Sequence, residues 1–436
     1  MNTVDIIIKK RNGVKLAPEE IKYMVEGYTA GNIPDYQMSA FLMAVYFSGM
    51  DREETVSLTE YMRVSGDVVD LSRIKGIKVD KHSTGGVGDK TTLVVGPLAA
   101  ACGVPVAKMS GRGLGFTGGT IDKLESIPGF QTAVEECEFI NQVNERGIAV
   151  IGQTGHIAPA DKKIYALRDV TGTVENLSLI TSSIMSKKLA AGSDAILLDV
   201  KCGSGAFMKT VEEAEKLGRL MVDIGNDSGK KTMAVISDME QPLGRAVGNS
   251  LEVSEAIDVL QGRGPADITE LSVQLAGMMI YLSGLAGNIA EGVEKAAAAL
   301  QSGRGLEKFR SFVEGQGGDP EITRSRELLP QAAHSMEVKA ERDGFITTLD
   351  AMKIGLASQH TGAGRQRKED QVDLSAGIVL HQKLGDSVSR GDVLCVLYGN
   401  DQTKLRLAAE EALAAFEIGD NAPEKRKLII KTIGDE

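Results

Sequence analysis

The sequence has little aromatic character: tryptophan is absent, and aromatic residues make up only 4% of the 436 positions. Proteins that bind single-stranded nucleic acids stack bases on aromatic side chains, so this scarcity disfavours such a role. Basic residues are not in excess either, because 49 lysines and arginines against 60 acidic residues leave a net charge of −11. This balance differs from that of proteins that bind nucleic acids or anionic membranes, and we expect neither as a partner.

Cysteine is also scarce. The four cysteines form no CxxC pair and have no histidine at ligand spacing; they are Cys102, Cys137, Cys202 and Cys395. Such scattered thiols are typical of a reducing compartment rather than of a disulfide framework or a zinc site. The N-terminal residues lack a signal-peptide core, and the uncharged stretch at 271–290 contains polar residues and glycines. We therefore predict a cytoplasmic protein in which this stretch forms a buried helix.

Glycine, by contrast, is abundant, and its 50 residues cluster in loops. The first 65 residues have the caps and apolar spacing of helices, whereas short apolar runs alternate with glycine loops and helical stretches from Ile77 onward. Alternation of this kind predicts a largely parallel sheet. Strands are expected at residues 77–79, 104–109, 148–151, 195–200 and 232–236, and a last helix near 408–417.

The predicted fold class is α/β, with three units. A small, discontinuous, all-helical lobe comprises residues 1–68 and 161–193. A large α/β lobe with a mainly parallel sheet comprises residues 69–160 and 194–335, and a C-terminal, hammerhead-like α+β unit comprises residues 336–436.

A first polar, glycine-rich loop, KHSTGGVGDKTT at residues 81–92, follows the strand expected at 77–79. Its glycines allow backbone N–H groups to turn toward an anion, Lys81 adds a positive charge, and Ser83 and Thr92 add hydroxyl donors. The order of residues does not match the Walker loop GxxxxGK[ST]. We interpret the loop as a phosphate-binding loop; the alternative is a plain glycine turn with a solvated lysine.

A second such loop, KMSGRGLGFTGGT at residues 108–120, follows the strand expected at 104–109. Because loops after adjacent parallel strands share one edge of a sheet, Ser110 and Thr120 can reach the same anion from another side. Gly113, Gly115 and Gly118 satisfy the GxGxxG pattern of dinucleotide sites. The residues Ser110-Gly111-Arg112 separate that pattern from the strand, however, and we predict no nucleotide cofactor.

The run SGRGLGFTGGTIDKLE at residues 110–125 resembles the signature of the thymidine/pyrimidine-nucleoside phosphorylase family, and KHSTGGVGD, ADKKIYALRD and SSIMSKK resemble other blocks of that family. The resemblance covers nearly the whole chain. It implies reversible phosphorolysis of pyrimidine nucleosides (uridine, thymidine, deoxyuridine) to the free base and α-(deoxy)ribose 1-phosphate, with inorganic phosphate as co-substrate. It also implies a phosphate site formed by Lys81, His82, Ser83, Thr92, Lys108, Met109, Ser110 and Thr120.

On the helical insert, Arg168, Ser183 and Lys187 match the pyrimidine-binding residues of the family. Ser183 and Lys187 are four residues apart, so they share one face of a helix. A departing pyrimidine carries negative charge, which Arg168 and Lys187 can stabilise as it develops. His82, whose ordinary pKa lies near neutrality, can donate a hydrogen bond to the base. His82, Arg168 and Lys187 are therefore the predicted catalytic residues; the alternatives are solvated charges and a histidine that only braces its loop.

The resemblance further implies a potassium ion near the phosphate site. The matching positions, mostly contributing backbone carbonyls, are Gly88, Leu243, Ala246 and Glu255. Lys90 departs from the family pattern where relatives usually carry threonine, and its ammonium could oppose or replace the ion. Phe116 departs as well, where relatives commonly carry histidine.

Two features of quaternary structure and motion follow from the resemblance and the chemistry. Members of the family usually form homodimers through the helical lobe, and the apolar helix at residues 37–47 can contribute to that interface. Phosphate and sugar react only when the attacking oxygen comes within ~3–3.5 Å of the C1′ carbon. We therefore expect the lobes to close about linkers near Val69–Lys75 and Pro159.

Several alternatives use the same residues. A thymidine-restricted phosphorylase would exclude ribose, whereas Lys108 in place of an apolar residue favours tolerance of ribose. A phosphoribosyltransferase of the anthranilate type shares the architecture but needs a diphosphate and magnesium site. The AMK sequence at Lys353 imitates a biotin carrier. Asp122 and Glu125 imitate a glycosidase pair, but their spacing of three residues indicates that they brace the loop.

Overall fold

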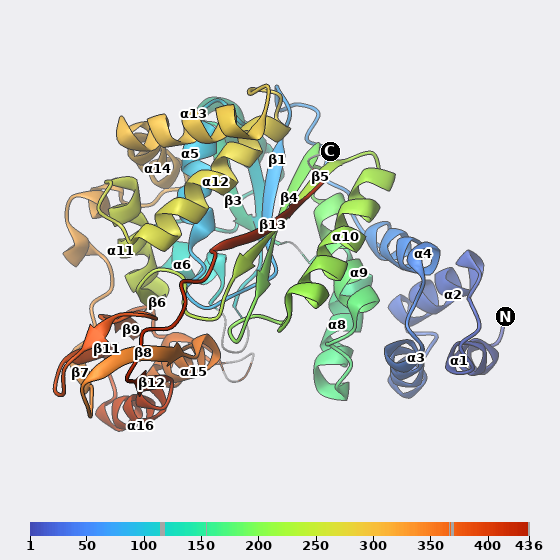
Figure 1. The fold of residues 1–436 in the computed structure, drawn as a ribbon. Coiled ribbons are helices and arrows are strands. Elements are labelled where there is room, and N and C mark those ends of the chain that lie inside the picture. The colour runs from blue at the N-terminus through green and yellow to red at the C-terminus, as the bar shows by residue number, and fades with distance from the viewer. Residues whose placement is uncertain (114–117, 154, 366, 368–369, 435–436) are drawn as a thin grey trace.

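The computed structural model describes residues 1–436 except 114–117, 154, 366, 368–369 and 435–436. It contains a helical lobe, a large lobe built on a mainly parallel sheet, and a C-terminal α+β unit (Figure 1). The predicted fold class is therefore confirmed.

The helical lobe is assembled from two separate parts of the chain: α1 (Thr3–Arg11), α2 (Pro18–Thr29), α3 (Asp35–Ser48) and α4 (Arg52–Arg63), then α8 (Pro159–Thr171) and α9 (Leu177–Ala190). The two parts contribute to the same core: Ile21, Met24 and Val25 on α2 are buried together with Ile164 of α8 and Leu179 of α9. The insert packs on α2, α3 and α4, so the two parts form one hydrophobic core.

The large lobe contains five parallel strands: β1 (Val79–Ser83), β2 (Val106–Ser110), β3 (Ile148–Gly152), β4 (Ala195–Cys202) and β5 (Lys231–Asp238). β4 pairs with β1 and β5, and β2 pairs with β3. One backbone hydrogen bond of 3.4 Å, from Val79 N to Pro105 O, joins the chain before β2 to β1. The carboxyl ends of β1 and β2 therefore lie together, as the two-loop interpretation requires.

Strand β1 differs from its prediction, because it begins at Val79 rather than Ile77 and continues to Ser83. Its sequence, Val-Asp-Lys-His-Ser, has almost no apolar character, yet Asp80 and Lys81 are buried. Charged partners on other strands and helices satisfy them, and such distant partners leave no mark on a local apolar pattern. Lys81 and His82 therefore belong to the strand and not to the loop that follows it.

Helices cover both faces of this sheet. Successive residues of β4 alternate between two cores: Ala195 and Leu197 face the core beneath α5 and α12, while Ile196 and Leu198 face the core beneath α10. The helices of the large lobe are α5 (Thr91–Ala101), α6 (Thr120–Glu125), α7 (Glu136–Arg146), α10 (Val211–Asp227), α11 (Asn249–Leu260), α12 (Ala266–Leu282), α13 (Ile289–Gln301) and α14 (Arg304–Gly315).

The uncharged stretch at 271–290 coincides largely with α12, whose Leu271, Leu275 and Met279 are fully buried, so the predicted buried helix is confirmed. Among the described residues, no helix combines the length and apolar character that crossing a bilayer requires.

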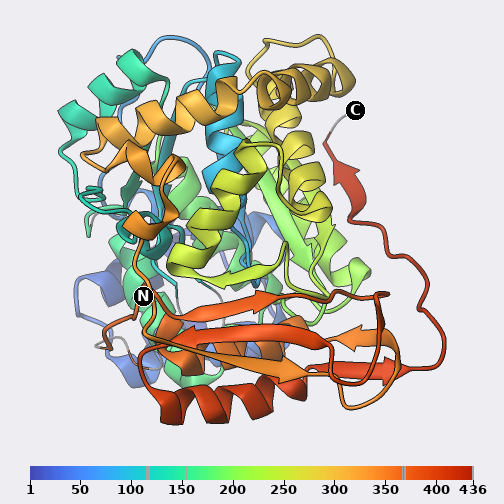
Figure 2. The same ribbon diagram turned by 90° about the vertical axis from the view of Figure 1, so that its left-hand side faces the viewer.

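The C-terminal unit exchanges strands with the large lobe (Figure 2). Its elements are β7 (His334–Lys339), β8 (Gly344–Leu349), α15 (Ala351–Ser358), β9 (Gly377–Leu380), β10 (Ser387–Val388), β11 (Val393–Gly399), α16 (Gln402–Leu413) and β12 (Phe416–Gly419). β6 (Ala246–Gly248) leaves the large lobe to pair with β9, and β13 (Ile429–Ile433) returns to pair antiparallel with β5. The predicted boundary of 336–436 therefore differs from the structure at β13, and the last helix ends before the expected 417.

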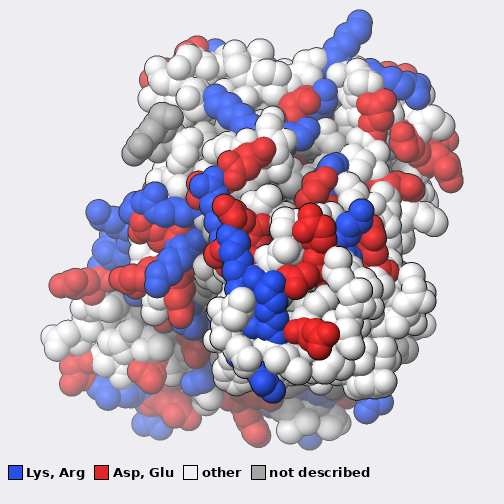
Figure 3. Space-filling view, turned by 90° about the vertical axis from the view of Figure 1, so that its right-hand side faces the viewer, with Lys and Arg blue, Asp and Glu red and all other residues white. Residues whose placement is uncertain are grey.

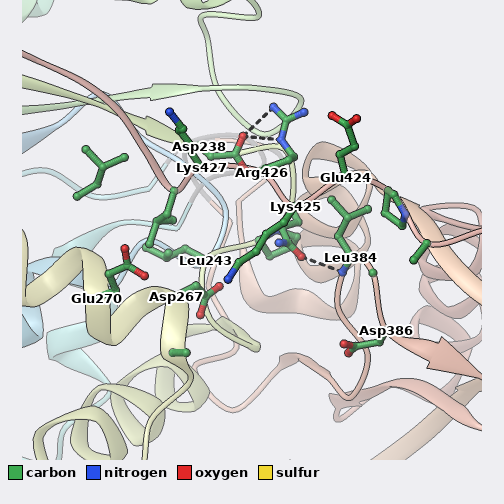
Figure 4. A pocket seen from close by; sticks show the side chains of 18 residues that line it. Asp238, Leu243, Asp267, Glu270, Leu384, Asp386, Glu424, Lys425, Arg426 and Lys427 are labelled. Carbon is green, nitrogen blue, oxygen red and sulfur yellow. Dashed lines mark hydrogen bonds and ion pairs between the residues drawn. The ribbon is translucent and has the colours of Figure 1, made fainter.

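The strap that leads from β12 to β13 crosses the large lobe and leaves a cavity of about 780 Å³ beneath residues 422–429 (Figure 4). Arg426 of the strap is anchored to Asp238 at 2.8 Å. Acidic residues that include Asp267, Glu270 and Asp386 line the cavity. Leu243 is the only predicted site residue among those that line this cavity, so the predicted phosphate- and base-binding residues lie elsewhere.

Candidate active site

A second cavity, of about 390 Å³, lies where the carboxyl ends of β1 and β2 face helices α8 and α9. It is lined by residues from both loops and from the helical insert. Its lining includes all predicted phosphate- and base-binding residues except one: His82, Ser83, Thr92, Lys108, Met109, Ser110, Thr120, Arg168, Ser183 and Lys187. Residues remote in the sequence thus meet between the two lobes.

Lys81 is the exception. Its ammonium donates to Thr91 Oγ1 at 2.6 Å and pairs with Asp199 Oδ2 at 3.2 Å, beneath the first loop. Because Thr91 begins α5, Lys81 ties the strand that carries His82 to the helix that carries Thr92. The structure therefore places Lys81 as a support of the phosphate loop, outside the cavity lining.

Asp80 organises the cations of the cavity floor. Its buried carboxylate accepts hydrogen bonds from Lys108 at 3.2 Å and from Lys188 at 2.8 Å. Burial alone would raise the pKa of Asp80, but the two lysines lower it below its ordinary value. One carboxylate thus serves two ammonium groups on the cavity floor.

Lys188 lines the cavity but is not among the predicted site residues. It directly follows Lys187 in the SSIMSKK block. Unlike a solvated surface lysine, it donates a hydrogen bond to Asp80, which lies more than a hundred residues away in the sequence. The sequence offers no local signal for that contact.

Burial lowers the pKa of Lys108 to about 8, and the neighbouring Lys188 and Lys81 act in the same direction against the opposing effect of Asp80. Lys108 therefore carries its charge at neutral pH and loses it just above.

His82 is neutral in this environment. Burial, and then the charges of Lys188 and Lys108, hold its pKa well below 6.5, contrary to the expectation of an ordinary value. Its Nε2 atom is buried and has no hydrogen-bond partner among the described residues. A neutral imidazole still carries one N–H, so His82 can donate a hydrogen bond but brings no charge.

The second loop is braced from behind. Asp122 accepts hydrogen bonds from Gly113 N at 2.7 Å and from Arg365 of the C-terminal unit at 2.8 Å. Glu125 forms a two-pronged pair with Arg112. The interpretation of Asp122 and Glu125 as loop supports is confirmed. Gly115 and Phe116 lie outside the described residues.

Backbone carbonyls hold Arg168 in place. Its guanidinium donates to Thr173 O at 3.1 Å, Leu179 O at 3.0 Å and Val174 O at 2.6 Å. Burial lowers its pKa to about 10, so it remains charged at neutral pH. Within the described part of the chain no carboxylate forms an ion pair with it, because Asp161 pairs with Lys187 instead. Three of its five N–H bonds are used, and two stay available for a ligand.

Ser183 and Lys187 share one face of α9, as predicted, and their Oγ and Nζ atoms are 3.0 Å apart. Lys187 also pairs with Asp161 of α8, a residue that the prediction missed. The second carboxylate oxygen of Asp161 is buried and has no partner among the described residues. Asp161 therefore fixes the Lys187 ammonium and joins the two helices of the insert.

The four predicted potassium ligands also lie together, but the ammonium of Lys90 stands among them. In the described residues, no group of three or more histidine, cysteine, aspartate or glutamate side chains has an arrangement that could hold a metal ion.

Family models divide the chain as the structure does. Residues 4–66 match the helical bundle domain of a glycosyl transferase family, and residues 75–306 match the a/b domain of that family. Residues 345–419 match the pyrimidine nucleoside phosphorylase C-terminal domain.

Curated relatives decide the assignment. A pyrimidine-nucleoside phosphorylase of Staphylococcus haemolyticus is 58% identical over 92% of this chain and 92% of its own. That of Geobacillus stearothermophilus is 56% identical over 96% of this chain and 98% of its own. This chain belongs to the pyrimidine-nucleoside phosphorylase family. The sequence blocks that resemble this family contribute residues to the lining of the cavity between the two lobes.

A likeness to a solved structure extends the fold beyond this family. Anthranilate phosphoribosyltransferase from Thermus thermophilus superposes with a TM-score of 0.58 at 20% identity, covering 72% of this chain and 99% of that one. At this identity the likeness shows the fold alone.

The geometry at Lys353 does not suit a biotin carrier. Lys353 lies in the first turn of α15, which Asp350 caps, and its Nζ donates to Ala414 O at 3.0 Å. The lysine of a carrier stands at the tip of a hairpin, which this helix is not.

Proposed function

We propose that the chain catalyses the reversible phosphorolysis of pyrimidine nucleosides, releasing the free base and α-(deoxy)ribose 1-phosphate. The observation that supports this most is the single cavity in which the floor gathers lysines and hydroxyls while the opposite wall carries Arg168, Ser183 and Lys187. Such a cavity suits an anion on one side and a flat, polar base on the other. The curated relatives bear the same activity in their names.

On the floor, phosphate would receive hydrogen bonds from the hydroxyls of Ser83, Thr92, Ser110 and Thr120, and positive charge from Lys108. Helix α5 begins at Thr91, so the positive end of its dipole would add to the attraction for phosphate at the same place. These donors would hold the nucleophile for attack on C1′ from the α face, with inversion of the β-nucleoside.

On the opposite wall, Arg168 and Lys187 would stabilise the negative charge of the departing base, which appears as the glycosidic bond breaks. Ser183 would contribute a hydrogen bond that fixes the orientation of the ring. His82, neutral and with an Nε2 that has no partner among the described residues, would donate to an oxygen of the base.

Movement of the helical lobe would bring the two substrates together. The linkers between the lobes cross closely: Asp67 N donates to His156 O at 2.9 Å, and Val69 N donates to Ala190 O at 2.9 Å. A Cβ atom at Gly66 would lie 2.0 Å from His156 O. These contacts form a narrow neck about which the lobes can rotate.

We also propose a homodimer that forms through the helical lobe. Tyr36 and Phe47 at the two ends of α3 are 74% and 80% exposed, while Met38 and Phe41 between them are buried. On the side of the helical lobe, the surface of the molecule carries interspersed acidic and basic side chains, together with a broad area without charge (Figure 3). Phe47→Glu is expected to convert a dimer to a monomer in light scattering, whereas an unchanged mass would refute this interface.

A cytoplasmic location and a part in nucleoside salvage complete the proposal. The four cysteines are all free, which fits a reducing compartment.

The test is phosphate-dependent release of base from uridine, thymidine and deoxyuridine. Release from all three is expected. Release from thymidine and deoxyuridine alone would establish a thymidine-restricted phosphorylase instead. Turnover that requires phosphoribosyl diphosphate and magnesium, with none in phosphate, would establish a phosphoribosyltransferase and refute the proposal.

A further inference from the structure

Lys90 ends the first loop and directly precedes α5. Its side chain is fully buried. The ammonium donates to Leu243 O and Ala246 O, both at 2.9 Å, and to the carboxylate of Glu255. An ammonium has three N–H donors and no acceptor, so these three oxygens satisfy it completely.

These oxygens belong to the residues that the family resemblance assigns to potassium, and they suit a single positive charge. They do not suit a second positive charge in addition to the ammonium of Lys90. The remaining oxygen of Glu255 already accepts from Arg245 N at 2.8 Å and Ala246 N at 3.2 Å. The backbone at Gly88 is packed so tightly that a Cβ atom there would lie 2.6 Å from Leu243 O. A potassium ion therefore does not fit while Lys90 keeps its place.

We propose that the Lys90 ammonium takes the place of the monovalent cation, so that this chain needs no potassium to order its phosphate loop. Lys90 is thus a positioning residue. It joins the start of α5, which carries Thr92, to the segment 243–246, and Leu243 N completes the joint by donating to Val87 O at 3.0 Å.

A second lysine extends the same joint into the C-terminal unit. Lys383 donates to Gly244 O at 2.7 Å and pairs with Asp267 at 3.1 Å. Arg245 donates to Leu380 O at 3.2 Å. The segment that receives Lys90 is therefore held from both sides, and the covalent tether of Lys90 makes the joint independent of any dissolved ion.

Thermal unfolding of the wild type and of Lys90→Thr tests this proposal, with tetramethylammonium, sodium, potassium or ammonium chloride at equal ionic strength. We expect the Tm of the wild type to be the same with all four cations. Lys90→Thr should unfold at a lower temperature in tetramethylammonium and regain several degrees when potassium or ammonium can enter the vacated site. The KM for phosphate should follow the same pattern.

The matched control is Lys123→Ala. Lys123 is equally buried, pairs with Glu252 at 2.8 Å and donates to Asp89 O of the same loop at 2.7 Å. Its loss should lower Tm without any selective recovery in potassium or ammonium, because its oxygens do not form the predicted cation site.

Two outcomes would overturn the proposal. One is a wild type that potassium stabilises over tetramethylammonium. The other is a Lys90→Thr protein that neither potassium nor ammonium stabilises selectively. If Lys90→Thr fails to fold in either salt, Lys90→Gln takes its place, and the absence of selective recovery in that variant would likewise overturn the proposal. Unfolding requires no substrate, so this result stands whether or not phosphorolysis is observed.

Discussion

The cleft holds its cations in two different ways: carboxylates hold the lysines, and backbone carbonyls hold Arg168. On the floor, the buried carboxylate of Asp80 pairs with Lys108 and Lys188, and beneath the first loop Asp199 pairs with Lys81. On the opposite wall, Asp161 pairs with Lys187 in the same manner, but backbone carbonyls hold Arg168 without an ion pair among the described residues. A carboxylate offsets part of the charge that it positions, whereas a carbonyl positions the guanidinium and leaves its full charge. Phosphate is an anion throughout the reaction, whereas the negative charge of the base first develops in the transition state, where uncompensated positive charge has most effect.

The largest expected effect comes from breaking the pairing on the floor. Asp80→Asn leaves Lys108 and Lys188 buried without their counterion, and removal of one partner from a buried pair costs about 3–5 kcal/mol. Urea unfolding measures this loss. Asp227→Asn is the control, because its partner Arg52 is exposed. Such surface pairs contribute about 0–1 kcal/mol. Equal stabilities of the two variants would show that Asp80 does not hold the floor.

Removal of the carbonyl-held cation should act on catalysis instead. Arg168→Ala is expected to lower kcat about 10²–10³-fold, the effect of losing one preorganised donor to a developing anion. It also leaves the carbonyls of Thr173, Val174 and Leu179 without their donor, so Tm should fall too. Arg168→Lys keeps the charge but not the fork of donors, and should recover only part of kcat. A loss of kcat below about tenfold in Arg168→Ala would contradict the contrast between the carbonyl-held arginine and the carboxylate-held lysines.

The pH dependence sharpens the description of the floor. Because the pKa of Lys108 is about 8, the KM for phosphate should rise as pH increases through 8 and the ammonium loses its proton. In the unfolded chain this lysine keeps its proton to a higher pH. The free energy of unfolding should therefore increase as the pH rises above 8, between the pKa of Lys108 in the folded protein and its higher pKa in the unfolded chain. Lys108→Gln should raise the KM for phosphate about tenfold at neutral pH and abolish the further rise in alkali. The KM for nucleoside serves as the internal control.

A further effect is expected at the neck between the two lobes. Gly66→Ala forces a Cβ atom against His156 O. This clash should destabilise the protein by about 1–3 kcal/mol and slow turnover if the neck must bend. Gly155→Ala, in the adjoining linker, meets only Lys162 Nζ at 3.9 Å and should change neither quantity. Equal Tm and equal kcat in the two variants would show that Gly66 is not part of the neck.

Sequence patterns predicted the features that depend on near neighbours. The caps and apolar faces of the N-terminal helices and the shared helix face of Ser183 and Lys187 each depend on residues three or four positions apart. The two loops were found for the same reason, because glycines and hydroxyl residues are concentrated within about a dozen positions.

Features that depend on distant partners escaped prediction. Strand β1 lacks an apolar pattern because Lys108, Lys188 and Asp199 satisfy its charges. The low pKa of His82 comes from burial and from lysines on several different elements. The return of β13 to β5 joins residues far apart in the sequence, which no local periodicity reveals.

That return has a consequence for biosynthesis. Chains fold from the N-terminus as they emerge from the ribosome. β5 therefore keeps an unpaired edge until residues 429–433 have been made. The centre of that edge, residues 233–236, is apolar, and an open apolar edge is a template for pairing with another nascent chain. A chain that stops before residue 429 should therefore aggregate, because β5 would keep its open edge.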